Sequence, residues 1–245
     1  MELRPLHDPK KGTMKVAALM SGGGSNLIKI LEHEKNLRSQ RGESPYKVVA
    51  IFSDNMLSNA EKIGKEYGIP AVINDIREFY RIKGKELNDL AVREQFDFVT
   101  AKTLSFYGVK TLAYCGYMSI TTPPLIEDFL GMNVHPADLS IEKDGKRKYA
   151  GYNAVKKAML AGELYLRSTT HLVEEEVDNG KILMISDPVK VMGDSVEENQ
   201  ERLKEAGDWK IFPKTLEYIS DGRYQMDEGG ELYFDGEPIP KGVTE

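Results

Sequence analysis

The chain has 245 residues, a formal net charge of −6 and one cysteine. This length can bury the core of one large α/β domain or two small ones. The acidic balance argues against non-specific nucleic-acid binding, and no apolar run approaches the roughly 20 residues that a membrane helix needs. The lone Cys115 rules out an internal disulfide and favours a reducing, cytoplasmic setting. Residues 1–13 are basic and lack the apolar core of a secretory signal, so we expect a disordered N-terminal extension.

The first buried strand leads directly into a glycine-rich loop. Lys15–Met20 is a nearly continuous apolar run, typical of a parallel strand covered on both faces. Ser21–Asn26 follows, and a helical period begins at Leu27. Bare backbone N–H groups at a helix N-terminus favour a phosphate. The loop lacks the P-loop lysine and the full dinucleotide fingerprint, which disfavours a nucleoside triphosphate or NAD. The alternative is a glycine turn capped by Ser25.

Strands and helices then alternate along the chain. We expect residues 35–45 to form a surface loop and one or two amphipathic helices to lie between residues 77 and 107. This alternation predicts an α/β fold with an open, mostly parallel twisted sheet and helices on both faces. The other expected strands cover 48–52, 71–73 and 111–118, and the other expected helices cover 58–67 and 123–129.

A strand that ends at His135 carries two polar side chains on one face. Asn133 and His135 are two residues apart, and Pro136 marks the end of the strand. An amide donor beside an imidazole suits the oxyanion of a tetrahedral intermediate, and the imidazole can also transfer a proton. Ligands of parallel sheets bind at the carboxyl ends of strands, where both this pair and the glycine loop fall. The alternative is an edge strand whose Asn and His satisfy loop backbone.

Two charged segments follow this strand. Residues 138–148 are interpreted as an exposed insertion, with a mobile lid as the alternative. Strands are expected at 168–173 and 182–185, and between them an acidic stretch ends in Asp178, which by default is a turn residue beside Asn-Gly.

The C-terminal region is expected to hold one long helix and a hairpin. Ser195 begins a capping-box pattern, so a helix is predicted from there toward Ser220 with a kink at Pro213. Residues 223–226 and 231–234 predict a closing hairpin.

Five short motifs occur in a fixed order between Met14 and Tyr233: Ser-Gly-Gly-Gly-Ser-Asn, Cys-Gly-Tyr-Met, Asn-Val-His-Pro, Thr-Thr-His-Leu-Val and Val-Asp-Asn-Gly. Their ordered combination resembles the glycinamide ribonucleotide formyltransferase family. That family has a mostly parallel α/β sheet and transfers a formyl group from 10-formyltetrahydrofolate to the amine of glycinamide ribonucleotide in purine synthesis. The resemblance implies one formyltransferase domain at 14–245, small-molecule substrates, no metal, nucleic acid or membrane, and a monomer or a homodimer.

Carried over by position, the resemblance implies that Asn133, His135 and Asp178 are catalytic. Asn133 and His135 would bond the formyl oxygen, while Asp178 would hold the imidazole and raise its pKa. The resemblance assigns the substrate phosphate to Gly24, Ser25 and Asn26, and the ribose or amine end of the substrate to Asp208. It assigns the folate to Arg77, Met118, Ser119, Ile120, Thr121, Asn133, Glu174, Glu175, Glu176, Val177 and Asp178.

The chain departs from the family pattern near these residues. His135-Pro136 is followed by Ala-Asp-Leu-Ser in place of Ser-Leu-Leu-Pro, Ser119 replaces a frequent Arg, and Lys181 replaces a usual Pro. These changes concern the acceptor and the folate contacts. The alternatives are formyl transfer to another phosphorylated amine, a formyltetrahydrofolate hydrolase, and a phosphate-ligand binding module without catalysis. A methionyl-tRNA formyltransferase is disfavoured by the acidic charge.

Overall fold

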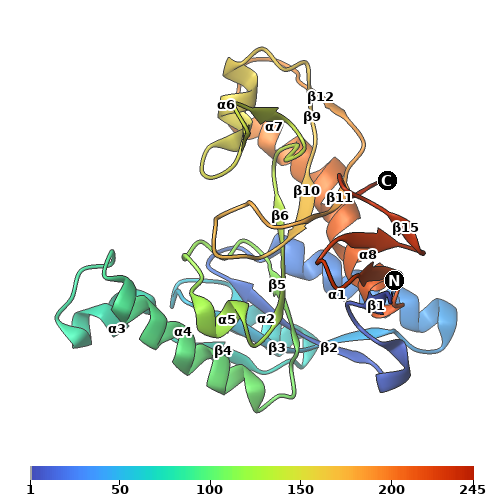
Figure 1. The fold of residues 1–245 in the computed structure, drawn as a ribbon. Helices are drawn as coiled ribbons and strands as arrows, with labels where there is room; N and C mark the ends of the chain where they lie inside the picture. The colour runs from blue at the N-terminus through green and yellow to red at the C-terminus, as the bar shows by residue number, and fades with distance from the viewer. Residues whose placement is uncertain (1) are drawn as a thin grey trace. The chain divides into compact units, whose positions relative to one another are not determined.

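A computed structural model describes residues 2–245 (Figure 1). The backbone separates into two compact units. The glycine-loop unit is Thr13–Met132, and the histidine unit is Asn133–Glu245 together with the residues up to Gly12. None of the helices among residues 2–245 is both long and apolar enough to cross a membrane.

The glycine-loop unit contains a parallel sheet with the strand order β5-β2-β3-β4. Residues Val16–Met20 of β2 are 0% exposed, which explains why this strand is apolar on both faces. The strands are β2 (Met14–Met20), β3 (Tyr46–Ser53), β4 (Ala71–Ile73) and β5 (Thr111–Tyr114). The helices are α1 (Ser25–Arg41), α2 (Ala60–Tyr67), α3 (Ile76–Lys83), α4 (Leu90–Ser105) and α5 (Pro123–Ile126).

Local capping accounts for two of these helices. The carboxylates of Asp75 and Asp89 accept backbone N–H bonds from the first turns of α3 and α4. Gly84 ends α3 in the left-handed conformation, with φ of 63°. Of the one or two helices expected between residues 77 and 107, the structure has two.

The predicted surface loop at 35–45 is wrong in its first half, because α1 continues to Arg41. Leu37 is buried, and the Glu34 carboxylate accepts from the Val48 backbone N–H at 3.0 Å and from Arg38 at 2.7 Å. These contacts bind the last turns of α1 to the unit, although the residue types there are mostly polar.

The histidine unit contains the strand order β16-β11-β10-β6, and β6 crosses the boundary between the units. β10 and β11 are antiparallel, whereas β11 and β16 are parallel. These strands are β6 (Leu130–His135), β10 (Thr169–Leu172), β11 (Ile182–Ile185) and β16 (Val243–Thr244). Two short antiparallel pairs are β7 (Glu142–Lys143) with β8 (Lys146–Arg147) and β9 (Tyr165–Leu166) with β12 (Val189–Lys190).

The helices of this unit include one irregular turn. They are α6 (Ala154–Leu160), α7 (Val196–Leu203), the π-helical turn η2 (Lys204–Asp208) and α8 (Trp209–Ser220). Pro213 lies inside α8, so the interruption of the predicted long helix falls at η2 and not at the proline. Gly207 is required there, because a Cβ atom would lie 2.7 Å from the Ser168 hydroxyl.

A small antiparallel sheet with the order β1-β13-β14-β15 joins the two ends of the chain. The predicted closing hairpin is confirmed as β13 (Tyr224–Met226) and β14 (Leu232–Phe234), next to β15 (Glu237–Pro238). The predicted disordered extension is wrong for the described part of 1–13, and Met1 lies outside the described residues. β1 (Arg4–Pro5) pairs with β13, and the 3-10 turn η1 (Pro9–Lys11) follows it. The polar composition of the first 13 residues suggested disorder, because it gives no sign that some of them pair with the edge of β13.

Candidate active site

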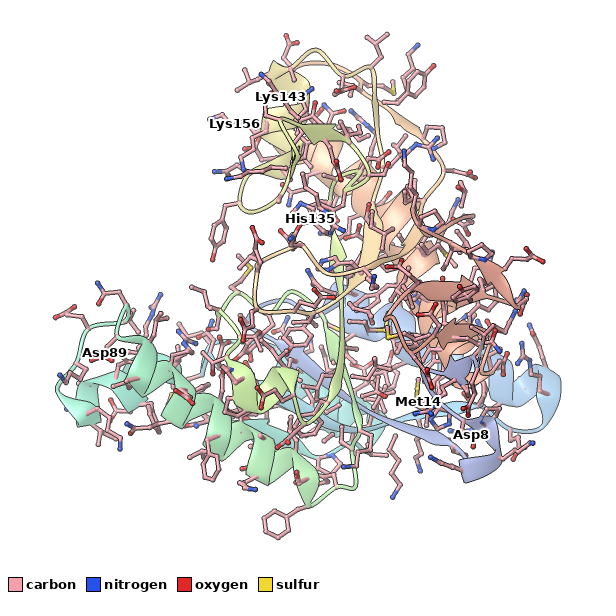
Figure 2. All side chains as sticks on the ribbon, in the orientation of Figure 1. Asp8, Met14, Asp89, His135, Lys143 and Lys156 are labelled. Atoms are coloured by element: carbon pink, nitrogen blue, oxygen red, sulfur yellow. The ribbon has the colours of Figure 1, made fainter. Side chains whose placement is uncertain are left out.

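His135 lies at the end of β6, where Figure 2 labels it, and its side chain is buried. Its Nδ1 atom is 3.1 Å from Oδ2 of Asp178, and its Nε2 atom is 2.8 Å from the carbonyl oxygen of Tyr149. Both ring nitrogens therefore face acceptors, an arrangement that suits the doubly protonated imidazolium. The structure brings together His135 and Asp178, which are far apart in the sequence.

The backbone conformation of the turn around Asp178 directs its carboxylate toward His135. Asp178 adopts the left-handed conformation with φ of 55°, which Asp tolerates better than most residues. A Cβ atom at Gly180 would lie 1.9 Å from the Leu172 carbonyl oxygen, so only glycine allows the turn to pack against β10. The backbone N–H of Gly151 donates to Asp178 Oδ2 at 2.8 Å.

A second histidine completes this cluster, and sequence reasoning missed it as a site residue. His171 is buried on β10, and its Nε2 atom lies 3.3 Å from Asp178 Oδ1 and 3.2 Å from the Asn133 amide nitrogen. Its Nδ1 atom is 2.7 Å from the Leu172 carbonyl oxygen, to which it donates. The motif Thr-Thr-His-Leu-Val carried the signal, but strand alternation alone does not tell which distant side chain lies opposite.

The pKa values of Asp178 and His135 are both lowered, but for different reasons. Burial raises the pKa of the Asp178 carboxyl, but the hydrogen bond from His171, the charge of His135 and the Gly151 N–H outweigh burial and lower this pKa to about 2. Burial lowers the pKa of His135, while Asp178 and the Tyr149 carbonyl oppose that shift. The prediction that the pKa of His135 is raised is therefore wrong. The pKa is lowered, because desolvation of the imidazolium exceeds the attraction of Asp178.

In the glycine-loop unit, Gly24 makes the turn from β2 into α1. It has φ of 76°, and a Cβ atom there would lie 2.6 Å from Ile63 Cδ1 and 2.8 Å from Met20 Cε. No side chain caps α1, so the alternative of a Ser25 cap is wrong. The first turn carries no acidic residue, and the helix N-terminus that begins at Ser25 and Asn26 suits an anion.

Ser21 links the glycine loop to the segment after β5. Its backbone N–H donates to the Gly116 carbonyl at 3.1 Å, and its hydroxyl accepts from the Met118 N–H at 2.9 Å. The Asn55 amide donates to the Ser21 carbonyl at 2.8 Å. Gly116, with φ of 77°, follows a strand that ends at Tyr114, earlier than the predicted end at Met118.

The predicted folate residues fall into two sets, one in each unit. Met118 and Ile120 are exposed, whereas the Ser119 hydroxyl donates to the Asp54 carboxylate. Arg77 is exposed on α3. The first set is Arg77, Met118, Ser119, Ile120 and Thr121, and the second is Asn133, Glu174, Glu175, Glu176, Val177 and Asp178.

Asp208 lies in η2 of the histidine unit and is buried. Its Oδ1 atom accepts from the Ser168 hydroxyl at 2.5 Å. Asp208 therefore bonds Ser168, the residue directly before β10. Its predicted contact with the substrate stays a prediction.

Residues 138–148 are not merely an exposed insertion. β7 and β8 form a hairpin, and the Arg147 guanidinium donates to the carbonyl oxygen of Asp178 at 2.5 Å. The tertiary fold therefore brings one end of the insertion to the cluster of His135, His171 and Asp178, which charge content alone does not reveal.

The arrangement defines a class of enzyme. An amide donor, a buried imidazole and an ionised carboxylate at a strand end suit transfer at a carbonyl carbon, in a fold whose helix N-terminus suits a phosphate. The family described as formyl transferase matches residues 14–216, and the chain belongs to this family. It is a formyltransferase by family, as the resemblance predicted.

Named relatives support the same class. The chain is 29% identical to the phosphoribosylglycinamide formyltransferase of Haemophilus influenzae, over 93% of this chain and 96% of that protein. It is 30% identical to the trifunctional purine biosynthetic protein adenosine-3 of Bos taurus over 91% of this chain, but it spans only 20% of that relative. The crystal structure of glycinamide ribonucleotide transformylase 1 from Symbiobacterium toebii matches with a TM-score of 0.72 and 25% identity, over 91% of this chain and 94% of that chain.

Proposed function

We propose that this formyltransferase moves the formyl group of 10-formyltetrahydrofolate to the amine of glycinamide ribonucleotide, a step of purine synthesis. The observation that carries the proposal is the 3.1 Å contact between His135 and Asp178 in the cluster that includes Asn133. The names of the relatives support this choice of acceptor.

The reaction needs one new bond, one broken bond and one proton transfer. The amine nitrogen of the acceptor attacks the formyl carbon, and the carbonyl oxygen takes up the negative charge. The amine proton leaves through a water that the ionised carboxylate of Asp178 orients, and it reaches N10 of the folate as the bond from carbon to N10 breaks. The pKa of about 2 keeps Asp178 ionised at neutral pH, so its carboxylate can hold the His135 imidazole and orient the water that carries the proton.

Two donors stabilise the oxyanion in this scheme. The Asn133 amide and His135 Nε2 would each supply a hydrogen bond, and the loss of one such donor typically costs about 3 kcal/mol. In the structure Nε2 bonds the Tyr149 carbonyl at 2.8 Å. His135 must therefore exchange this partner for the formyl oxygen, while Nδ1 keeps Asp178.

The remaining predicted contacts complete the proposal. The N-terminus of α1, with Gly24, Ser25 and Asn26, would bind the substrate phosphate, and Asp208 would bind near its ribose or amine end. The folate contacts would be the two sets of residues described above. We also propose that residues 14–245 act as one domain, because the family match at 14–216 includes residues of both units. The free, buried Cys115 supports a cytoplasmic setting, and sedimentation can decide between a monomer and a homodimer.

One assay tests the proposed reaction and separates it from its alternatives. Purified protein is mixed with 10-formyltetrahydrofolate and candidate amines, and release of tetrahydrofolate is followed. Release that requires glycinamide ribonucleotide supports the proposal. Release with no amine indicates a hydrolase, and release only with another phosphorylated amine changes the acceptor. Silence with every amine, together with phosphate-ligand binding, indicates a binding module and overturns the proposal.

A matched pair of glycine variants tests the phosphate loop. Gly24→Ala places a Cβ atom against Ile63 and Met20 at positive φ, so we expect at least a tenfold rise in KM for glycinamide ribonucleotide. Gly23→Ala is the control, because its Cβ atom would meet nothing within 4 Å. An equal KM in both variants would show that the substrate phosphate does not bind at this loop.

A further inference from the structure

The inserted hairpin contacts the catalytic pair through one short segment. Arg147 donates to the carbonyl oxygen of Asp178, and the Gly151 N–H donates to its carboxylate. Between them, the carbonyl oxygen of Tyr149 bonds His135 Nε2. Three alternate residues of this segment thus hold the main chain of Asp178, its carboxylate and the imidazole.

The hairpin gives Arg147 a defined position. Arg147 pairs with Glu142 across the two strands, and the turn is Asp144-Gly145 with both residues at positive φ, the pattern of a tight hairpin. The Lys148 N–H donates to the Ile141 carbonyl at 2.9 Å directly after the second strand. The side chain of Arg147 is therefore presented by regular backbone and not by a free loop.

The contact acts on a strained residue. Asp178 is one of four residues other than glycine at positive φ among residues 2–245, a conformation that an L-residue adopts only where its surroundings hold it. A guanidinium that donates to its carbonyl oxygen makes a charge-assisted bond that helps to hold this conformation. The negative charges of Glu174, Asp178 and Glu142 attract the same guanidinium and favour its charged form.

We propose that Arg147 is a positioning residue of the transfer reaction, which fixes the main chain of Asp178 so that the carboxylate keeps its contact with His135 Nδ1. This inference rests on the proposed function. It gives the inserted hairpin a role in the reaction: Arg147 holds Asp178 in place while His135 Nε2 exchanges the Tyr149 carbonyl for the formyl oxygen.

The test compares Arg147→Met and Arg147→Lys with the control Lys143→Met in the full chain. Lys143 is exposed in the same hairpin and lies apart from His135 in Figure 2. We expect Arg147→Met to lower kcat at least tenfold, since small misplacements at a reacting centre cost up to about a hundredfold. KM for both substrates should change less than threefold. Arg147→Lys, which keeps a charged donor, should recover at least half of the lost activity on a logarithmic scale, and Lys143→Met should match wild type.

An NMR measurement makes the test independent of turnover. We expect the Gly151 amide, which donates to Asp178, to exchange with solvent at least tenfold faster in Arg147→Met and at the wild-type rate in Lys143→Met. A kcat within twofold of wild type together with unchanged Gly151 exchange would overturn the inference. If Arg147→Met does not fold, Arg147→Gln replaces it, with at least a fivefold loss of kcat expected. A wild-type chain without transfer activity defeats the proposed function, and Gly151 exchange then decides the positioning role by itself.

Discussion

Two buried aspartates, one in each unit, have opposite acidities. Asp178 of the histidine unit is 8% exposed, and Asp97 on α4 of the glycine-loop unit is 0% exposed. The pKa of Asp178 is lowered to about 2, whereas burial raises the pKa of Asp97 to about 6. Burial by itself therefore does not decide which carboxylate is ionised.

Their partners explain the difference. Asp97 accepts from the backbone N–H and hydroxyl of Thr122, and Arg93 adds an attraction that the nearby charge of Asp54 partly cancels. Asp178 has two imidazoles within 3.3 Å. At Asp97 the desolvation of the carboxylate exceeds the effect of its partners, whereas at Asp178 the two histidines and the Gly151 N–H outweigh it. The contrast leaves Asp178 ionised at neutral pH, as its proposed role beside His135 requires, and gives Asp97 a structural contact with Thr122, next to the predicted folate segment.

The largest expected effect separates the two residues by activity. Asp178→Asn removes the negative charge that holds both histidines and, in the proposed reaction, orients the proton-carrying water, so we expect kcat to fall about a thousandfold. Asp97→Asn keeps an acceptor for Thr122 and should leave kcat within threefold of wild type. Steady-state kinetics with glycinamide ribonucleotide measure both. A similar loss in the two variants would refute the division of roles.

His171 provides the next effect. His171→Asn removes one of the two imidazoles beside Asp178, and loss of such a charge-assisted bond typically costs about 1.5 to 3 kcal/mol. We expect kcat to fall roughly ten- to hundredfold. His33→Asn, at a histidine of α1 in the other unit, is the control for loss of an imidazole. Wild-type turnover in His171→Asn would show that His135 alone controls Asp178.

The stability of the protein should respond to pH in opposite directions at the two aspartates. Because the folded-state pKa of Asp178 is lowered, its stabilisation is complete above the unfolded pKa near 4 and is lost as pH falls toward 2. The raised pKa of Asp97 means that its stabilisation is complete below about 4 and is lost as pH rises through 6. Each contribution is about 2 to 3 kcal/mol.

Denaturant unfolding between pH 2.5 and 8 checks this pair of signs. Asp178→Asn should flatten the acid limb of the stability curve, and Asp97→Asn should flatten the part between about pH 4 and 6. Curves of the same shape in both variants would contradict the opposite shifts.

The smallest expected effect concerns Thr122. Thr122→Val removes the hydroxyl donor of Asp97, which should raise the pKa of that carboxyl further and cost about 1 kcal/mol of unfolding free energy. Thr103→Val, at a half-buried position of α4 where the hydroxyl bonds only its own helix backbone, is the control and should change stability by less than about 0.5 kcal/mol. An equal loss in the two variants would mean that the Thr122 hydroxyl contributes nothing to Asp97.

Local sequence determined several features of this protein. The apolar run of β2, the glycine loop before α1 and the alternation of strands and helices predicted the α/β fold, which is confirmed. Strand periodicity placed Asn133 and His135 on one face, and the order of the motifs identified the family, which is confirmed. The strands, the helices and the shared face of Asn133 and His135 depend on neighbours in the chain and follow from spacing, whereas the family came from the resemblance of the ordered motifs.

Only the tertiary structure decided which distant groups meet. Periodicity assigns a face to His171 but not the carboxylate that lies 3.3 Å away, and charge content does not bring Arg147 to the carbonyl of Asp178. The opposite pKa shifts of Asp178 and Asp97 also depend on burial and on partners from other elements. Solvation and electrostatics act through space, so residues far apart in the sequence set them.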